Sequence, residues 1–557
     1  MGSVSLPESP DVIVVGAGFS GLYALHRFAQ LGLTTRCFES GSDVGGVWHW
    51  NRYPGARVDS EFPFYQLNLP KLWRGFDFTE RFPDHVEIRR YLNHVADTLQ
   101  LRQRIEFDSK VTSARWSEAD RKWTVTTSAG HQVSARYLFS CTGLLHKTNT
   151  PNFPGLDKYK GTVHHSGDWS DSIGDLAGQR VCVVGAGATG VQIVSALGKT
   201  AARLTSLVRR PSYCLPMANR SLSPAEVAAW KPMLPSILGV ARKTSASGLL
   251  ATRPAESIWS VPEAEREAYY EYLWRAGGFG FGQGNYPDMI VDAKANRIAY
   301  DFWCKKTRKR ITDPKKRDIL APLEPPYPFM TRRVPLEHDY YDVVNRDNVD
   351  VVDLKATPIK EFTETGVVFE GGGSCEFEHL IMATGFESFS GSLVNMGLLD
   401  KNGRDIKDIW AETGIETYMG LSIHGFPNFF MCYSPQAPTA LSNGPTIIEC
   451  QVDYVVDAIQ ALETQAGPTA ARIEPTRAAQ EAWCQMVDAM ARPTLFVQTE
   501  SWWTASNIEG RKPQMLTYLG GIPEYEKQIR ETIGGGWKGY DVGRKAERGV
   551  GLPTSVM

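Results

Sequence analysis

The sequence lacks any long hydrophobic run and any closely spaced cysteine pair. No stretch approaches the roughly 18 consecutive apolar residues of a membrane helix, so no membrane span is expected. The nine cysteines among the 557 residues form no CxxC or CxxxxC pair, which excludes a dithiol redox site and a zinc ribbon. Scattered thiols are typical of a reduced intracellular protein. We interpret all nine as packing residues and expect no metal site.

An excess of charge of either sign is also missing. The 60 Lys and Arg residues nearly balance the 62 Asp and Glu residues, which leaves a formal net charge of −2. A nucleic-acid-binding protein would show a basic excess, so no nucleic-acid partner is expected. The 51 glycines and 33 prolines are ordinary for a globular chain. The length predicts about two to four domains.

Neither end of the sequence carries a recognisable targeting signal. Residues 1–6 contain neither the positive nor the apolar segment of a secretory leader. Leu6 stands where a myristoylation signal has Ser or Thr. Residues 554–557 (TSVM) match neither a peroxisomal nor a prenylation signal. We therefore expect a cytoplasmic protein.

The first forty residues follow the pattern of a β-α-β dinucleotide-binding unit. Residues 11–15 (DVIVV) predict a buried parallel strand. The glycine pattern at 16–21 (GAGFSG) comes next, then residues 22–31 with helical apolar spacing, then a second strand at 34–38. That strand ends at Glu39. A glycine-rich surface turn is the alternative, which the flanking strands and the terminal acid disfavour.

Each glycine of this pattern has a separate physical role. Gly16 permits the tight turn, Gly18 lets the backbone approach a pyrophosphate, and Gly21 brings the helix against the strand. The helix N-terminus offers free N–H groups and a positive dipole to the phosphates. Glu39 would accept hydrogen bonds from ribose hydroxyls, so the unit predicts FAD or NAD. The expected contacts are Gly16, Gly18, Phe19, Ser20, Gly21 and Glu39.

A second unit of the same kind begins at residue 180. A strand at 180–184 (RVCVV) leads into 185–190 (GAGATG) and an apolar helix. The next strand, 204–208, ends in Arg209 and Arg210 instead of an acid. A carboxylate there favours a free ribose 2′-OH, whereas guanidinium groups accommodate a 2′-phosphate, so this unit predicts NADP. Solvated surface charges are the alternative. The expected contacts are Gly185, Gly187, Ala188, Thr189, Gly190, Gln192, Arg209 and Arg210.

Two dinucleotide sites in one chain predict electron transfer from a nicotinamide to a flavin and onward. Because no cysteine pair can accept the electrons, oxygen or a bound small molecule is left as the acceptor.

The segment between the two units identifies a family. Residues 159–169 (YKGTVHHSGDW) resemble the FxGxxxHxxxW fingerprint of type I Baeyer–Villiger monooxygenases, which are class B flavoprotein monooxygenases, with Tyr159 in place of Phe. Related enzymes that oxidise amines and sulfides usually carry Tyr or Phe where Trp169 stands. The histidine of the fingerprint, His165, is interpreted as a hydrogen-bonded strut and not as an acid or base.

Four further stretches carry the same resemblance. Residues 45–59 (GGVWHWNRYPGARVD) resemble the family's GGxWxxNRYPGxxxD segment, and 382–386 (MATGF) its ATGF motif. Residues 332–349 resemble the KRxP…YY…NRxNV block, with Arg332 in place of Lys. Residues 501–510 match the SW…GANxPGK motif only in part. The resemblance covers most of the chain and is weakest between about 215 and 319.

The resemblance implies a reaction. FAD and NADPH would be the cofactors, and a C4a-peroxyflavin would insert one oxygen atom of O2 into a ketone to give an ester or lactone. Small-molecule ketone and O2 are then the expected partners of a monomer or weak oligomer, with neither nucleic acid nor membrane. An enzyme that oxygenates nitrogen or sulfur on the same scaffold is the alternative, and a catalytically silent flavoprotein is a third hypothesis. Which ketone is used cannot be predicted.

The resemblance also assigns roles to single residues. Arg333 would stabilise the negative charge of the peroxide and of the ketone adduct, and Asp59 would orient Arg333. Arg332 would meet the 2′-phosphate together with Arg209. Trp502 would lie against the NADP ribose, with a place in the core as the alternative. The further contacts expected at the flavin are Gly46, Val47, Trp48, Asp59 and Tyr65.

The expected fold is α/β with two Rossmann-like domains. Residues 1–150 and 385–557 would form the FAD domain, and 151–220 and 325–384 the NADP domain. A helical insertion, 221–324, would line the substrate cleft. Helices are expected at 224–241 and 261–276, and glycine turns at 277–282. The basic stretch 305–317 is interpreted as a solvated helix face ending near Pro314, with steering of NADPH as the alternative.

Overall fold

The computed structural model describes residues 6–468, 471–508 and 510–543. The terminal residues examined for targeting signals, 1–5 and 554–557, lie outside this part of the chain, as does Glu509 of the 501–510 stretch. Throughout the described ranges, every helix is too short or too polar to cross a lipid bilayer.

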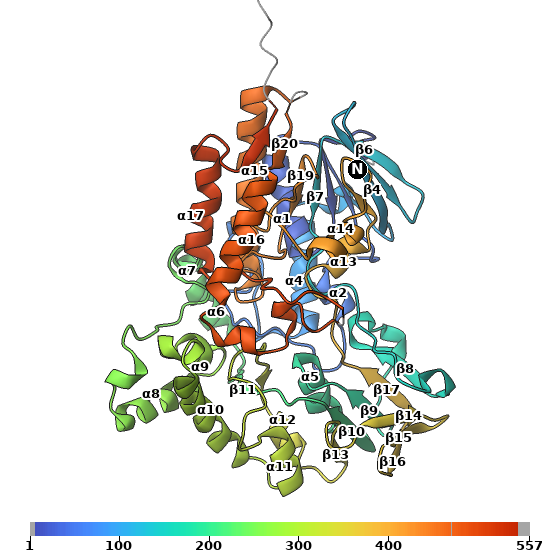
Figure 1. Ribbon diagram of the computed structural model, residues 1–557, viewed down its shortest axis with the longest axis vertical. Helices are drawn as coiled ribbons and strands as arrows, with labels where there is room; N and C mark the ends of the chain where they lie inside the picture. The colour runs from blue at the N-terminus through green and yellow to red at the C-terminus, as the bar shows by residue number, and fades with distance from the viewer. Residues whose placement is uncertain (1–5, 469–470, 509, 544–557) are drawn as a thin grey trace, which may run out of the picture.

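A five-stranded parallel sheet forms the upper half of the molecule (Figure 1). All four side chains of its central strand are buried, because both faces of the sheet are covered. Helix α1 (Phe19–Gln30) packs against the long helix α15 (Gly444–Ala466). In spatial order the strands are β19 (Phe429–Met431), β7 (Tyr137–Ser140), β1 (Val12–Val15), β2 (Thr35–Phe38) and β3 (Ile105–Glu106).

A second five-stranded parallel sheet lies in the lower half (Figure 1). Helix α5 (Ala188–Leu197) follows its central strand directly, as α1 follows β1. The expected α/β class with two Rossmann-like sheets is confirmed. In spatial order the strands are β13 (Val349–Asp353), β10 (Arg203–Val208), β9 (Arg180–Val184), β17 (His379–Met382) and β8 (Thr162–His165).

Smaller sheets extend each half. A four-stranded sheet adjoins the first half and a three-stranded sheet the second. The first consists of β18 (Leu398–Leu399), β4 (Val111–Ser117), β5 (Lys122–Thr127) and β6 (Gln132–Ala135). The second consists of β14 (Ile359–Phe362), β15 (Gly366–Phe369) and β16 (Ser374–Glu376). Two short pairs are β11 (Leu215–Pro216) with β12 (Leu336–Glu337), and β20 (Ile473–Pro475) with β21 (Tyr540–Val542).

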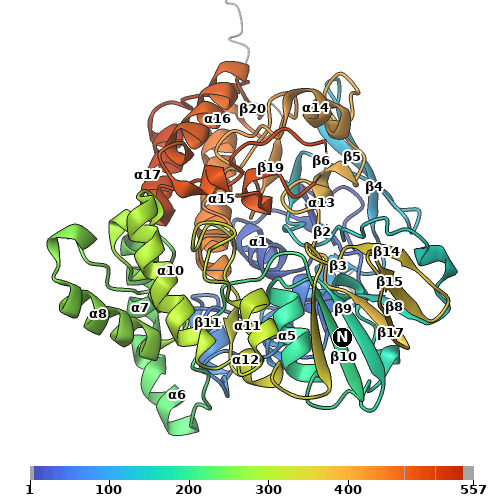
Figure 2. The same cartoon turned by 60° about the horizontal axis from the view of Figure 1, so that its bottom comes forward.

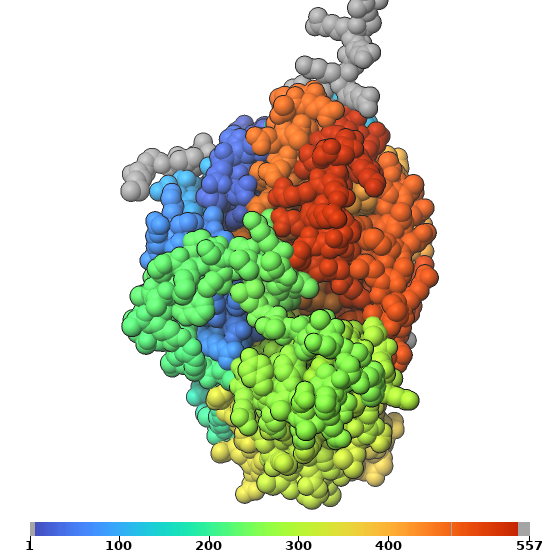
Figure 3. Space-filling model, turned by 90° about the vertical axis from the view of Figure 1, so that its left-hand side faces the viewer, coloured from blue at the N-terminus to red at the C-terminus, as the bar shows by residue number. Residues whose placement is uncertain are grey.

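Six α-helices between β10 and β12 form a separate group on one side of the molecule (Figure 2). Tyr300 and Trp303 anchor this group through an aromatic core shared with the second sheet. Figure 3 shows the group lying against the C-terminal helices, which agrees with the contact between α7 and α17 (Gly521–Gly534). The helices are α6 (Pro224–Trp230), α7 (Leu234–Thr244), α8 (Glu263–Ala276), α9 (Gly280–Gln283), α10 (Ala293–Arg308) and α11 (Pro314–Leu320).

Proline and glycine positions in this group correct three expectations. The helix expected over 224–241 is interrupted by a 3-10 turn at Lys231–Met233, where Pro232 lacks the N–H that a continuous helix needs. Pro314 starts α11 and does not end α10, because Asp313 caps the first turn and proline fits that position. The expected glycine turn is partly helical, since Gly280 starts α9.

The remaining helices connect these parts. Helix α17 packs against α15 in the upper half (Figure 1). The set comprises α2 (Val47–Trp50), α3 (Pro70–Arg74), α4 (His85–Thr98), α12 (Tyr340–Val343), α13 (Gly391–Val394), α14 (Ile406–Thr413), α16 (Arg477–Ala491) and α17 (Gly521–Gly534).

Candidate active site

The first glycine turn joins β1 to α1. Gly16 has a positive φ of +104°, and a Cβ there would lie 2.6 Å from the Cys141 carbonyl oxygen. A Cβ on Gly21 would overlap the Gly16 carbonyl, so the helix can approach the strand only at glycine. No side chain caps the first turn of α1, which begins at Phe19 and Ser20. Its N–H groups are therefore available to a phosphate.

Glu39 lies at the end of β2 and is 4% exposed. Its carboxylate accepts hydrogen bonds from the Ala17 N–H at 2.7 Å and from the Gly41 N–H at 2.7 Å. Burial nevertheless raises the pKa of Glu39. The carboxylate is thus held against the glycine turn, where the sequence pattern predicts the ribose.

Residues of the 45–65 segment gather beside this turn. A Cβ on Gly46 would lie 2.9 Å from the Gly18 Cα, so the two backbones are in close contact. Val47 and Trp48 start α2, and the Trp48 Nε1–H donates to the Tyr65 hydroxyl at 3.0 Å. The Tyr65 ring lies 5.1 Å from that of Phe19. The structure therefore brings the predicted flavin contacts together.

The second glycine turn joins β9 to α5 and is open on one side. Nothing lies within 4 Å of a Cβ built on Gly187. Helix α5 begins at Ala188 and Thr189, and no side chain caps its first turn. Gly185 and Gly190 repeat the close contacts of Gly16 and Gly21. A phosphate can therefore reach the N-terminus of α5 directly.

Three guanidinium groups converge beside this turn. Arg209 and Arg210 follow β10 directly, and Arg332 lies 5.3 Å from the centroid of the Tyr327 ring. Burial lowers the pKa of Arg332, and the charges of Arg210 and Arg209 lower it further. Within the described chain, no carboxylate forms an ion pair with Arg209 or Arg332, whereas Arg210 pairs with Glu500 at 2.5 Å. A cluster with this surplus of positive charge fits a multiply charged anion such as a 2′-phosphate.

Asp59 and Arg333 form an ion pair, although 274 positions separate them in the sequence. A second Arg333 nitrogen, Nη1, donates to the Ala440 carbonyl at 3.3 Å. The guanidinium lies 5.8 Å from the centroid of Phe279. Burial opposes the charge of Arg333, but the Asp59 carboxylate outweighs it and raises the Arg333 pKa. Arg333 is therefore a fixed cation at physiological pH.

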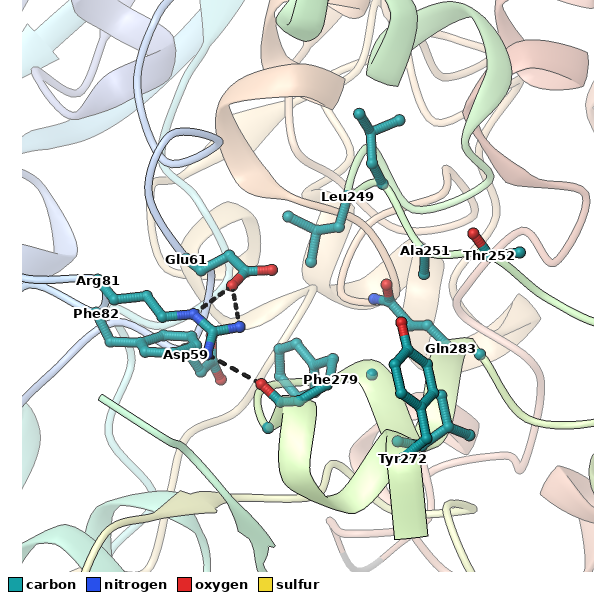
Figure 4. A pocket seen from close by; sticks show the side chains of 16 residues that line it. Asp59, Glu61, Arg81, Phe82, Leu249, Ala251, Thr252, Tyr272, Phe279 and Gln283 are labelled. Carbon is teal, nitrogen blue, oxygen red and sulfur yellow. Dashed lines mark hydrogen bonds and ion pairs between the residues drawn. The ribbon is translucent and has the colours of Figure 1, made fainter. Parts of the chain in front are cut away.

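A cavity of about 200 Å³ adjoins this ion pair. In Figure 4, Asp59, Glu61 and Arg81 lie on one side, and side chains of the helical group lie on the other. Arg81 is held by Glu61, to which its Nε–H donates at 2.6 Å. The mainly apolar opposite side comprises Leu249, Leu250, Ala251, Thr252, Tyr272, Leu273, Phe279 and Gln283.

Gln192 is placed between the two halves of the molecule. Its Oε1 accepts a hydrogen bond from the Tyr53 hydroxyl at 2.9 Å, and its Nε2 donates to the Arg57 carbonyl at 3.0 Å. These bonds tie α5 to the loop that leads to Asp59. The sequence pattern predicted a cofactor contact for Gln192 and contained no sign of this connection.

Two other residues of the sequence motifs have structural contacts. The half-buried Trp502 packs on Phe389, with ring centroids 5.4 Å apart. The His165 Nδ1 accepts a hydrogen bond from the Gly167 N–H at 3.0 Å, and burial lowers the His165 pKa. His165 is thus a hydrogen-bonded strut, as predicted.

The sequence analysis missed two residues that contact the predicted site: Glu500, which pairs with Arg210, and Ala440, whose carbonyl accepts from Arg333. Neither belongs to a motif that signals a ligand.

Comparison with known proteins gives a consistent result. Residues 9–238 match the family model "FMO-like: Flavin-binding monooxygenase-like". The chain is 38% identical to the FAD-binding monooxygenase acrE of Aspergillus aculeatus over 94% of its own length and 87% of that protein. It is 36% identical to cyclopentanone 1,2-monooxygenase of Comamonas sp. over 97% of each chain.

Solved structures agree with these relatives. The closed crystal structure of cyclohexanone monooxygenase superposes with a TM-score of 0.91 at 36% identity, covering 96% of this chain and 99% of that one. The OTEMO complex with FAD and NADP gives a TM-score of 0.90 at 33% identity, covering 96% and 100%.

Proposed function

The chain belongs to the type I Baeyer–Villiger monooxygenases, and from this premise we propose how its residues perform the reaction. It is an FAD- and NADPH-dependent monooxygenase that inserts one atom of O2 into a ketone and forms an ester or lactone. The ion pair between Arg333 and Asp59, beside a cavity and between two dinucleotide turns, is the observation that carries the assignment. The ketone and O2 are its small-molecule partners.

The two cofactors fit the residues that the structure presents. FAD would be held at the uncapped N-terminus of α1 and at Glu39, and NADPH at α5 and the three arginines. When bound, the cofactors supply the electrons and activate the oxygen. The open space at Gly187 and the unneutralised charge of Arg332 are the features that support this fit.

The role of Arg333 is to stabilise negative charge next to the reacting carbonyl. A guanidinium held in place needs no reorganisation when charge develops, so its effect is larger than that of water. Asp59 keeps Arg333 charged and oriented, and the Ala440 carbonyl fixes a second nitrogen. Leu249 and Phe279 on the cavity wall would exclude water from the same place.

The strand order supports a proposed division of the chain into domains. We assign residues 1–150 and 385–557 to the FAD domain, because β1, β2, β7 and the late strand β19 share one sheet. Residues 151–220 and 325–384 form the NADP domain, and 221–324 the insertion whose side chains line the cavity.

Composition supports a proposal for the location and partners of the protein. The nine free cysteines, most of them buried, support a cytoplasmic location. The net charge of −2 supports the absence of a nucleic-acid partner. A monomer or weak oligomer is proposed.

A panel of linear, monocyclic and polycyclic ketones tests the function. The purified yellow protein should consume NADPH and O2 faster with a ketone, and mass spectrometry should detect the ester or lactone. An S-oxide from a thioether without any ketone turnover would favour the alternative oxygenation. A flavin that NADPH cannot reduce would contradict both.

A further inference from the structure

Glu500 is the acidic side chain that meets the arginine cluster. Its Oε2 lies 2.5 Å from Arg210 Nη2, and 63% of the side chain is exposed. The hydrogen bond and charge of Arg210 lower the pKa of Glu500, and Arg209 and Arg332 lower it further. All three guanidinium groups therefore stabilise the charge of the Glu500 carboxylate. This carboxylate occupies the position where we propose that a 2′-phosphate binds.

The segment around Glu500 is docked on the cluster by a second contact. The hydroxyls of the buried residues Thr499 and Thr331 lie 2.6 Å apart, and Thr331 immediately precedes Arg332. Two residues beyond Glu500, Trp502 packs on Phe389. Residues 499–502 thus bridge the arginine cluster and the half of the molecule that contains the first sheet.

We propose that Glu500 is a specificity-determining residue that substitutes for the 2′-phosphate until NADPH displaces it. The inference rests on the proposed binding of NADPH at Arg209, Arg210 and Arg332. A phosphate forms more charge-assisted hydrogen bonds than one carboxylate, so it displaces Glu500 from Arg210. NADH has no 2′-phosphate, and Glu500 stays paired in its presence. The ion pair therefore lowers the affinity for NADPH but not for NADH, so Glu500 moderates the preference for NADPH.

Binding of 2′,5′-ADP by titration calorimetry tests this proposal, with 5′-AMP as the ligand that lacks the 2′-phosphate. Glu500→Gln removes the competing charge and keeps the shape of the side chain. We expect 2′,5′-ADP to bind about two- to fivefold more tightly, the size typical of an exposed ion pair, and 5′-AMP to bind unchanged. In an Arg210→Ala background, Glu500→Gln should have no further effect, because the carboxylate has lost its partner.

The matched control is Glu412→Gln. Glu412 on α14 pairs with Arg404 at 2.8 Å, and the side chains of Arg404 and Glu412 are 51% and 65% exposed. This control should change neither affinity.

Three results would overturn the proposal in different ways. Weaker binding of 2′,5′-ADP to the Glu500→Gln variant would mean that Glu500 orients Arg210 for the phosphate. An equal change for both ligands would show a general structural effect. If 2′,5′-ADP fails to bind the unaltered protein, the coenzyme assignment itself is wrong, which separates that failure from a failure of the inference.

Discussion

At the scale of single residues, charge placement decides the chemistry. Arg333 carries a cation that Asp59 fixes in orientation and in protonation state. Arg332 carries a cation that no carboxylate of the described chain neutralises. The same side-chain type therefore serves two purposes: one guanidinium is prepared for transient charge on the substrate, and the other for the permanent charge of a coenzyme.

Replacing Arg333 tests the first purpose. Arg333→Ala should lower ester formation by about 10²–10³-fold or more, the loss typical of removing one donor to developing negative charge. Arg333→Lys should recover only part of the rate, because a single ammonium group cannot replace two guanidinium nitrogens that bond separately to Asp59 and to the Ala440 carbonyl. Product is measured by gas chromatography and mass spectrometry, with Arg404→Ala as the control. Normal ester output from Arg333→Ala would refute the assigned role.

Replacing Arg209 or Arg332 tests the second purpose. Each alanine variant should raise the KM for NADPH about tenfold or more, because a hydrogen bond between charged groups is lost. The KM for NADH should change little. Steady-state kinetics with the two coenzymes measure the effect, and an equal rise for both would contradict a 2′-phosphate site.

At the scale of secondary-structure elements, hydrogen bonds between elements fix the position of the Asp59 loop relative to α5. The loop that carries Asp59 is bonded to α5 through Tyr53 and Gln192. Helix α5 also offers its N-terminus to the coenzyme, so this connection joins the two sites physically.

Removing the Tyr53 hydroxyl should loosen that connection. We expect Tyr53→Phe to lower the amount of ester formed per NADPH consumed, by about two- to tenfold, because Asp59 and Arg333 are then less well positioned. The KM for NADPH should remain close to that of the unaltered protein. Tyr159→Phe is the control, since it loses a similar hydrogen bond to the Phe377 carbonyl elsewhere. If the unaltered protein, Tyr53→Phe and Tyr159→Phe all form the same amount of ester per NADPH consumed, Tyr53 has no positioning role.

Helix α15 contains a buried acid that makes stability depend on pH. Glu449 accepts a hydrogen bond from the Asn68 N–H at 2.5 Å, yet burial raises its pKa from 4.5 to about 7. The folded protein therefore holds this proton more tightly than the unfolded chain, and stability is lost as pH rises from about 4.5 to 7. Above that range the full cost of the buried charge remains.

Glu449→Gln should remove this dependence. The amide oxygen keeps the bond to Asn68 without a charge, so the variant should be more stable at pH 8, by up to about 3 kcal/mol. Near pH 4.5 the two proteins should melt at similar temperatures. Melting temperatures of both proteins across this range measure the effect, and a difference that stays constant with pH would contradict it.

At the scale of the whole molecule, the helical group is fastened to the first half by ion pairs. Arg242 on α7 bonds to Asp453 on α15 at 2.7 Å and to Glu526 on α17 at 2.6 Å. Its side chain is only 18% exposed. These bonds fix α7, which precedes the cavity-lining residues 249–252, relative to the FAD domain that we propose.

Arg242→Ala should lower the melting temperature by several degrees, since it removes a cationic partner from two partly buried carboxylates, Asp453 and Glu526. Arg404→Ala is the control, because Arg404 and Glu412 are 51% and 65% exposed and such pairs contribute little. Differential scanning calorimetry measures both. Similar melting temperatures for the two variants would show that the Arg242 bonds are no stronger than a surface pair.

Contiguous residues determined much of this protein. The two glycine turns and the strands around them were predicted correctly, because each depends on neighbours within about forty positions. The phosphate-binding role of Arg209 and Arg210 after β10 stays a prediction. The family was predicted from residues 159–169, and the comparisons confirm it. Prolines were interpreted less well: Pro232 interrupts a helix and Pro314 begins one, and the sequence pattern alone did not separate these cases.

Tertiary structure decided which distant side chains meet. Arg333 reaches Asp59 across 274 positions, and Arg210 reaches Glu500 across 290. No repeating pattern in the sequence predicts such a pair, because the contact depends on how two sheets and a helical group pack together. Local geometry follows from the chemistry of adjacent residues, whereas the charge balance of the site depends on packing between parts that are far apart in the chain.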